Sequence, residues 1–285
     1  MKQFLLCTDL DRTLIPNGKQ QESKQALELF RWLAGHEAIL LAFVTGRHRV
    51  LVEQAISEYE LPQPDFVIAD VGSTIYRTGK SNWQVMEEWS ELIDKDWHGL
   101  AHEDLYRQLS VYPMLKLQES EKQGRHKLSF YVSLDADSEK LLHEMDVRLK
   151  HADIKANLVW SIDPIAHTGL LDVLPASAGK LQAIHHLMQL NGFTLGNTVF
   201  AGDSGNDLDV LCSDIQAILV ANSDEEVKEQ ARSHAAKDSL YIAKGGYLGM
   251  NGNYSAGILE GMAHYFPEID ARLRDKTGMV DKADV

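Results

Sequence analysis

The sequence has few cysteines, few prolines and no long apolar run. Its two cysteines, Cys7 and Cys212, allow at most one disulfide, which excludes a disulfide-rich secreted scaffold. Seven prolines among 285 residues, with no low-complexity tract, exclude a fibrous or disordered chain. The apolar run at residues 38–44 is too short to span a bilayer, and that at residues 4–7 is too short for a signal peptide. We therefore predict a cytoplasmic protein that is neither exported nor inserted into a membrane.

Basic residues are outnumbered by acidic ones. The chain has 28 Lys and Arg against 42 Asp and Glu, a formal charge of -14, which disfavours nucleic acid and anionic membranes as partners. The same charge repels a phosphorylated metabolite, so such a substrate would need a local cation, a bound metal or helix N-termini. A chain of 285 residues is also about the size at which proteins divide into two domains.

Short apolar runs typical of buried strands alternate with segments of helical periodicity. One predicted helix carries Ala26, Leu29, Phe30 and Leu33 on one face and ends at Gly35. Alternation of this kind predicts a parallel sheet covered by helices on both faces, which is a Rossmann-like α/β core. The predicted strands are residues 4–8, 38–44, 66–69, 170–174, 198–201 and 217–221.

This alternation is interrupted between residues 81 and 167. Apolar residues follow a period of two at Leu128, Phe130, Val132 and Leu134, which predicts a strand with one buried face. A helical segment at residues 141–149 and a strand at residues 157–162 follow. We predict a smaller α/β cap domain, residues 81–167, inserted into a core made of residues 1–80 and 168–285. Three tryptophans in the insertion are interpreted as its core: Trp83, Trp89 and Trp97.

Carboxylates follow two of the predicted strands directly. Asp9 and Asp11 lie after residues 4–8, where open α/β sheets bind ligands, and can divide the roles of nucleophile and general acid. Asp203 and Asp207 follow residues 198–201 and lie one helical turn apart, a spacing suited to Mg²⁺. The alternatives are a solvated turn at the first pair and a metal-free helix cap at the second.

Two further segments could assist a phosphate. Thr45, Gly46 and Arg47 end the second strand and offer a hydroxyl and backbone N–H groups. Lys180 begins a helix, and its ammonium could offset the gathered negative charge. Taken singly, each is more often structural, and the order of all four segments is what indicates a phosphate site.

Four segments, D-L-D-R-T-L, V-T-G-R, A-G-K and G-D-S-G-N-D, in this order resemble the haloacid dehalogenase superfamily of aspartate-nucleophile phosphatases. Further segments, among them V-G-S at residues 71–73 and L-D-V-L-P at residues 171–175, are similar to sucrose-phosphate phosphatase and mannosylfructose-phosphate phosphatase. The resemblance implies that Asp9 attacks phosphorus, that Asp11 is the acid and base, and that Thr45 and Lys180 hold phosphoryl oxygens. It also implies a Mg²⁺ site. The implied metal residues are Asp9, Asp11 through its carbonyl, Asp203, and Asp207 in or near the metal's water shell.

The resemblance implies a phosphatase acting on a phosphorylated sugar, with sucrose 6-phosphate as the expected substrate. Other sugar phosphates, a phosphomutase activity and a non-catalytic sugar-phosphate-binding module are the alternatives, and a sucrose-phosphate synthase is the candidate protein partner. Lys127, on the polar face of a cap strand, is the candidate sugar-reading residue, with a solvated lysine as the alternative. The candidate substrate-binding residues are Thr45, Gly46, Arg47, Gly72, Ser73, Lys127, Lys180 and Asn206.

One position departs from the family pattern. Arg12 stands beside Asp11 where glycine or asparagine is expected. The alternatives are contact with the substrate and pairing with a surface carboxylate, and we expect the pairing.

Overall fold

The computed structural model describes residues 3–79, 82–163 and 166–278, and it divides into two compact units. The first unit comprises residues 1–45, 52–67 and 187–285, and the second comprises residues 46–51 and 68–186. The division of the chain into a core and an inserted domain remains a prediction. Its first boundary, between residues 80 and 81, lies outside the described residues.

The first unit contains parallel strands in the order β12, β11, β10, β1 and β2. Every residue of β1 and β2 is buried, as their continuous apolar sequences predict for a sheet covered on both faces. Strand β3 carries the chain from this unit into the second. The bounds are β1 (Phe4–Thr8), β2 (Ile39–Val44), β3 (Phe66–Ala69), β10 (Thr198–Gly202), β11 (Gln216–Leu219) and β12 (Leu240–Ile242).

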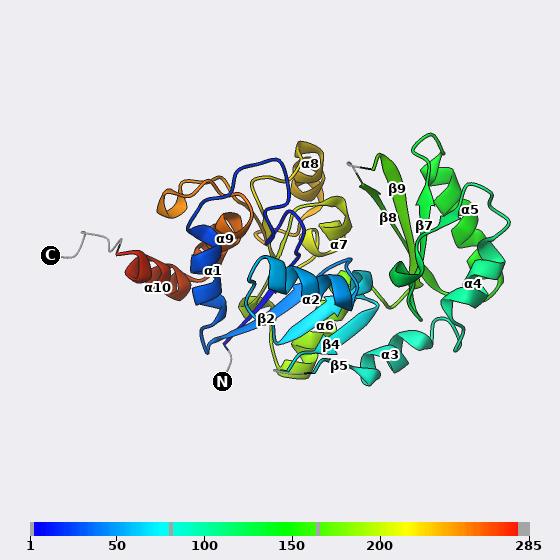
Figure 1. Cartoon of the computed structure of the whole chain (residues 1–285), viewed down its shortest axis with the longest axis horizontal. Helices are drawn as coiled ribbons and strands as arrows, with labels where there is room; N and C mark the ends of the chain where they lie inside the picture. Colours follow the sequence, from blue (N-terminus) through cyan, green and yellow to red (C-terminus); the bar gives the residue numbers. More distant parts are fainter. Residues whose placement is uncertain (1–2, 80–81, 164–165, 279–285) are drawn as a thin grey trace. The chain divides into compact units, whose positions relative to one another are not determined.

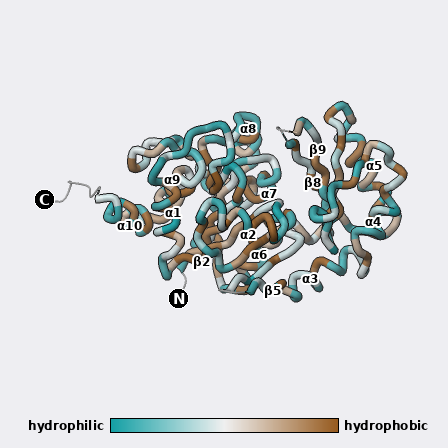
Figure 2. Tube along the Cα trace, viewed as in Figure 1, coloured by the Kyte–Doolittle hydropathy of each residue, from teal (hydrophilic) through white to brown (hydrophobic). Residues whose placement is uncertain are grey.

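Helix α1 shows how sequence periodicity fixes the packing of this unit. Its buried residues are Ala26, Leu29, Phe30 and Leu33, and Gly35 follows its end, as predicted. The helix packs against α9, and the two lie side by side in Figure 1. Helix α8 has one buried residue, Ala231, and is hydrophilic over most of its length (Figure 2). The helices are α1 (Ala26–Ala34), α7 (Leu208–Leu211), α8 (Glu225–His234), α9 (Ser255–Tyr265) and α10 (Pro267–Thr277).

The second unit contains a four-stranded antiparallel sheet in the order β6, β7, β9 and β8. Helices α4 and α5 cover one face of this sheet (Figure 1). Trp97, Phe130 and Met145 are central to the core between them. The bounds are α3 (Glu87–Asp94), α4 (His102–Leu109), β6 (Lys116–Leu117), β7 (Leu128–Val132), α5 (Ser138–His151), β8 (Ala156–Asp163) and β9 (Thr168–Pro175).

Strand β9 corrects one expectation. Residues 170–174 were predicted as a strand of the parallel core, but β9 lies between β7 and β8 and is antiparallel to both. Asp172 interrupts its apolar run, so Gly169, Leu171 and Val173 are buried while the residues between them are half-buried. That alternation marks a strand with one open face, and its signal was concealed because Leu170 and Leu174 are apolar at positions that alternate with the buried ones. Leu134, also predicted for the β7 alternation, lies beyond β7 and is exposed.

The remaining elements connect these parts. Helices α2 and α6 each contain residues of both units. Within the described residues, no helix is long and apolar enough to cross a membrane. The bounds are α2 (Arg49–Glu58), β4 (Thr74–Arg77), β5 (Gln84–Val85) and α6 (Lys180–Asn191), with 3₁₀ turns η1 (Asp70–Gly72), η2 (Ser120–Lys122), η3 (Leu195–Asn197), η4 (Gly205–Asp207) and η5 (Tyr247–Gly249).

Candidate active site

Three candidate residues follow neighbouring strands of the first unit. Strand β1 is parallel to β10 and β2, with Thr8 opposite Ala201 on one side and Phe43 on the other. The carboxyl ends of the three strands therefore share one edge of the sheet, where ligands bind in open α/β folds. Asp9, Thr45 and Asp203 come directly after or within two residues of these paired positions, and all three are buried.

The carboxylates of Asp9, Asp203 and Asp207 form a compact acidic cluster. One oxygen from each lies within 4.8 Å of the others, and the three residues are buried. Buried carboxylates at this spacing repel one another strongly unless a cation compensates them. Oxygen donors are also the ligands that Mg²⁺ prefers. The donor set therefore fits a hard divalent cation.

Asp207 also fixes the loop that carries Asp203. Its Oδ2 accepts hydrogen bonds from the backbone N–H groups of Asp203 and Ser204, each at 3.1 Å. Gly202 is required beside it, because a Cβ there would lie 2.7 Å from the Asp207 carboxyl carbon. Asn206 accepts a hydrogen bond from the Ser204 hydroxyl at 3.0 Å within the same turn. This loop orients the Asp203 carboxylate toward the cluster.

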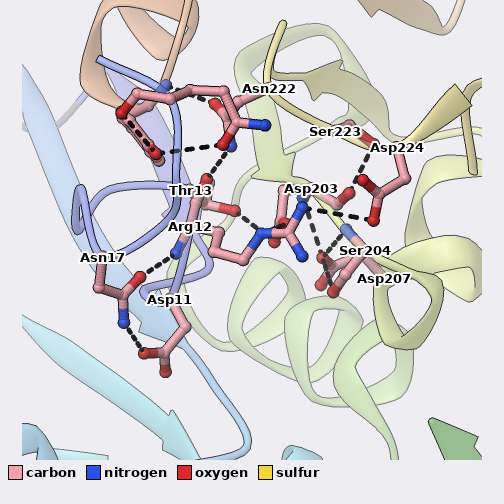
Figure 3. A network of polar contacts seen from close by, with 12 residues as sticks. Asp11, Arg12, Thr13, Asn17, Asp203, Ser204, Asp207, Asn222, Ser223 and Asp224 are labelled. Carbon is pink, nitrogen blue, oxygen red and sulfur yellow. Dashed lines mark hydrogen bonds and ion pairs between the residues drawn. The ribbon is translucent and has the colours of Figure 1, made fainter. Parts of the chain in front are cut away.

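Asp11 lies apart from that cluster in the described part of the chain. It is half-buried, and its Oδ1 accepts a hydrogen bond from the Asn17 side-chain amide at 2.6 Å (Figure 3). A carboxylate outside the acidic cluster can exchange protons, as a general acid and base must. Asn17 was not a candidate from the sequence, where it reads as an ordinary turn residue in P-N-G.

Arg12 pairs with two carboxylates, of which one was expected. Its Nε lies 3.2 Å from Oδ2 of Asp203, and its Nη2 lies 3.4 Å from Oδ2 of Asp224 (Figure 3). The expected surface carboxylate is Asp224, but the buried Asp203 is the second partner. Thr13 also donates to Asp203, from its hydroxyl to Oδ1 at 3.2 Å.

A second group of candidates lies within the other unit. Gly72 has φ +95°, and a Cβ on it would lie 2.3 Å from the carbonyl group of Gly179 and 2.7 Å from the backbone nitrogen of Lys180. Gly46 lies close to the side chain of Val71, which belongs to the same turn as Gly72. The structure therefore brings the V-G-S segment, Gly46 and the buried Lys180 together at the start of α6.

Other candidates of this unit are held by local backbone contacts. Ser73 donates its hydroxyl to the Asp70 carbonyl at 3.0 Å. Arg47 donates from its guanidinium to the Leu51 carbonyl at 3.2 Å and accepts from the Asp70 N–H at 3.1 Å. Ser73 therefore contacts its own turn, whereas Arg47 contacts both its own segment and the turn that begins at Asp70.

Lys127 is buried and is not a solvated lysine. Its Nζ lies 3.8 Å from a carboxylate oxygen of Asp70 and equally far from one of Asp172. Burial raises the pKa of Asp70 to about 6, with Lys127 opposing the rise and Asp172 adding to it. Ser129 donates to Asp172 at 2.5 Å, so both carboxylates belong to one polar network. The sequence did not indicate Asp70, although D-V-G-S carried the signal of a special turn.

A sequence model of the sucrose-6F-phosphate phosphohydrolase family matches residues 2–266. This chain belongs to that family. It is accordingly a phosphoric monoester hydrolase with the haloacid dehalogenase fold.

Curated relatives of this chain include a HAD-like hydrolase and a sucrose-phosphatase. A Nitrosococcus oceani protein named only as a HAD-like hydrolase is 49% identical to this chain over 288 residues. The match covers 100% of this chain and 77% of the Nitrosococcus protein. Sucrose-phosphatase 1 of Nicotiana tabacum is 29% identical over 289 residues, which are 98% of this chain. This chain spans only 63% of the tobacco protein's length.

A solved structure shares the fold. The sucrose-phosphatase of Synechocystis sp. PCC6803, determined in complex with sucrose and phosphate, superposes with a TM-score of 0.77 at 24% identity. The match covers 93% of this chain and 98% of that one. It confirms the predicted α/β class with a mostly parallel sheet.

Proposed function

We propose that this chain is a Mg²⁺-dependent phosphatase that hydrolyses sucrose 6-phosphate to sucrose and phosphate through an aspartyl phosphate on Asp9. The observation that carries the proposal is the buried cluster of Asp9, Asp203 and Asp207 at one sheet edge of a family member. A dianionic phosphate cannot approach three carboxylates unless they are compensated by a cation.

In the first step, a carboxylate oxygen of Asp9 attacks phosphorus while the bond from phosphorus to the sugar oxygen breaks. Asp11 donates its proton to that oxygen, because an alkoxide is a poor leaving group. In the second step, a water molecule attacks phosphorus, Asp11 takes the water's proton, and the bond to Asp9 breaks. Inorganic phosphate is released, and Asp9 and the proton on Asp11 are restored.

Asp9, Asp203 and the carbonyl of Asp11 would hold Mg²⁺, with Asp207 in or near its water shell. When bound, the ion supplies the positive charge that the phosphate dianion and its transition state require. Thr45 and Lys180 would bind the phosphoryl oxygens. Backbone groups of Gly46, Gly72 and neighbouring residues would assist them.

Phosphate release from a panel of sugar phosphates tests this proposal. The panel contains sucrose 6-phosphate, mannosylfructose phosphate, trehalose 6-phosphate and hexose phosphates, with Asp9→Asn as the inactive control. We expect sucrose 6-phosphate to have the highest kcat/KM, activity to stop in EDTA, and Mg²⁺ to restore it better than Ca²⁺.

Other outcomes would support the alternatives. Preference for another sugar phosphate would change the substrate but keep the chemistry. Isomerised sugar phosphate with little free phosphate would indicate a phosphomutase. Binding without turnover of any substrate would indicate a binding module and contradict the proposal.

A further inference from the structure

The backbone of Arg12 is held in a conformation that arginine rarely adopts. Its φ is +59°, in the left-handed region that favours glycine and asparagine. Two asparagines fix the peptide groups on either side: Oδ1 of Asn17 accepts from the Arg12 N–H at 2.8 Å, and Nδ2 of Asn222 donates to its carbonyl at 2.6 Å. Strain maintained by surrounding contacts is a feature of functional sites.

This conformation directs the guanidinium to two carboxylates of different character. Asp203 has a side chain 2% exposed and belongs to the acidic cluster, whereas that of Asp224 is 69% exposed. Figure 3 shows Arg12 extended between them. The guanidinium is thus a cation beside the carboxylate that the proposed function gives to Mg²⁺.

We infer that Arg12 is a positioning residue that sets the affinity for Mg²⁺ by competing with the ion for Asp203. The inference rests on the proposed function. Without the ion, the guanidinium compensates the buried carboxylates through Asp203. With the ion present, two cations beside one carboxylate repel each other, and Asp224 becomes the partner that holds the guanidinium.

The two partners predict opposite effects on Mg²⁺ binding. Arg12→Asn keeps a residue suited to positive φ and removes the competing charge, so it should lower the Kd for Mg²⁺ by about tenfold, the smaller end of the effect of an adjacent charge on a carboxylate. Asp224→Asn should raise the Kd for Mg²⁺. Of its two carboxylate partners the guanidinium then keeps Asp203, where it competes with the ion. In the double variant, loss of Asp224 should have little further effect.

Isothermal titration of EDTA-stripped full-length chain with MgCl₂ tests the inference. Wild type, Arg12→Asn, Arg12→Lys, Asp224→Asn and the double variant are compared, and Arg12→Lys, which keeps the charge, should stay near wild type. Melting in EDTA and in Mg²⁺ gives a second measurement. Arg12→Asn should melt lower than wild type in EDTA and gain more from Mg²⁺, because its carboxylates have lost their cation.

The outcomes separate this inference from the proposed function. An unchanged or higher Kd in Arg12→Asn, with Mg²⁺ still bound, overturns the role of Arg12 alone. An Asp224→Asn effect that persists in the double variant also overturns it, since it shows a direct charge effect. If Arg12→Asn does not fold, the Asp224→Asn and Arg12→Lys titrations still decide. Absence of Mg²⁺ binding in wild type and all variants overturns the magnesium site and the inference with it.

Discussion

The Asn17 side chain donates a 2.6 Å hydrogen bond to the carboxylate of Asp11, which is outside the acidic cluster in the described residues. The same side chain accepts from the Arg12 N–H. Asn17 therefore fixes the turn after the proposed nucleophile and the direction of the proposed acid and base together.

Asp11→Asn should lower kcat for sucrose 6-phosphate by about 10²–10⁴, because an amide can neither protonate the sugar oxygen nor accept a proton from water. Steady-state phosphate release measures the loss, and circular dichroism checks the fold. A variant that turns over at the wild-type rate would remove Asp11 from the chemistry.

Lys127→Ala should lower kcat/KM for sucrose 6-phosphate by about 1.5–3 kcal/mol, the value of a hydrogen bond to a charged group, and leave a small aryl phosphate nearly unaffected. The variant also leaves Asp70 and Asp172 without this cation, so its melting temperature must be measured beside its kinetics. Lys122→Ala, in the same segment but paired with Glu119, is the matched control. Equal losses on both substrates would show that Lys127 supports the fold and does not read the sugar.

Asp70 should make stability depend on pH. Its pKa is raised from near 3.8 to about 6, mainly by burial, so the folded state binds a proton more tightly than the unfolded state. The contribution of Asp70 to the free energy of unfolding is fully present below about pH 4 and is lost as the pH rises through 6. The change amounts to about 3 kcal/mol. Urea unfolding of wild type and Asp70→Asn across pH 4–7 should show the variant gaining relative stability with pH. A constant difference would contradict the raised pKa.

Gly72→Ala should destabilise the chain by about 2–5 kcal/mol, because it adds positive-φ strain and a Cβ 2.3 Å from the Gly179 carbonyl group. Gly192→Ala is the control, since Gly192 also has positive φ but no atom within 4 Å of its Cβ, so only the strain remains. Equal losses in melting temperature would show that close approach at Gly72 does not matter.

Much of the core could be predicted because burial on both faces leaves a plain sequence signal. The strand bounds at residues 4–8 and 66–69 and the buried face of α1 were predicted as the structure has them. Strand β9 was assigned to the wrong sheet, because the apolar Leu170 and Leu174 hid the alternation of its sequence. The sheet to which a strand belongs depends on its long-range pairing, which no local pattern contains.

The candidate site, like the fold, was predicted from the sequence only in part. Asp9 and Asp203 follow apolar strands, so sequence and fold class together predicted that they lie near each other. The partners of Arg12 and Lys127 could not be predicted, because they are distant in sequence. Asp224 and Asp70 lie in or beside turns, and Asp172 is brought near Lys127 by the pairing of β9 with β7. Polar residues in turns have no periodicity from which their contacts could be inferred.

Covalent labelling of Asp9 in the Asp11→Asn variant with p-nitrophenyl phosphate tests directly whether Asp9 is the nucleophile. Nitrophenol needs little acid assistance to leave, whereas hydrolysis of the aspartyl phosphate still needs a base. If Asp9 is the nucleophile, the variant should release a burst of about one nitrophenol per chain, with phosphate on the peptide containing Asp9 after an acid quench. Asp9→Asn should show neither. No burst and no bound phosphate in Asp11→Asn, or more than about a hundredth of wild-type turnover in Asp9→Asn, would contradict that role of Asp9.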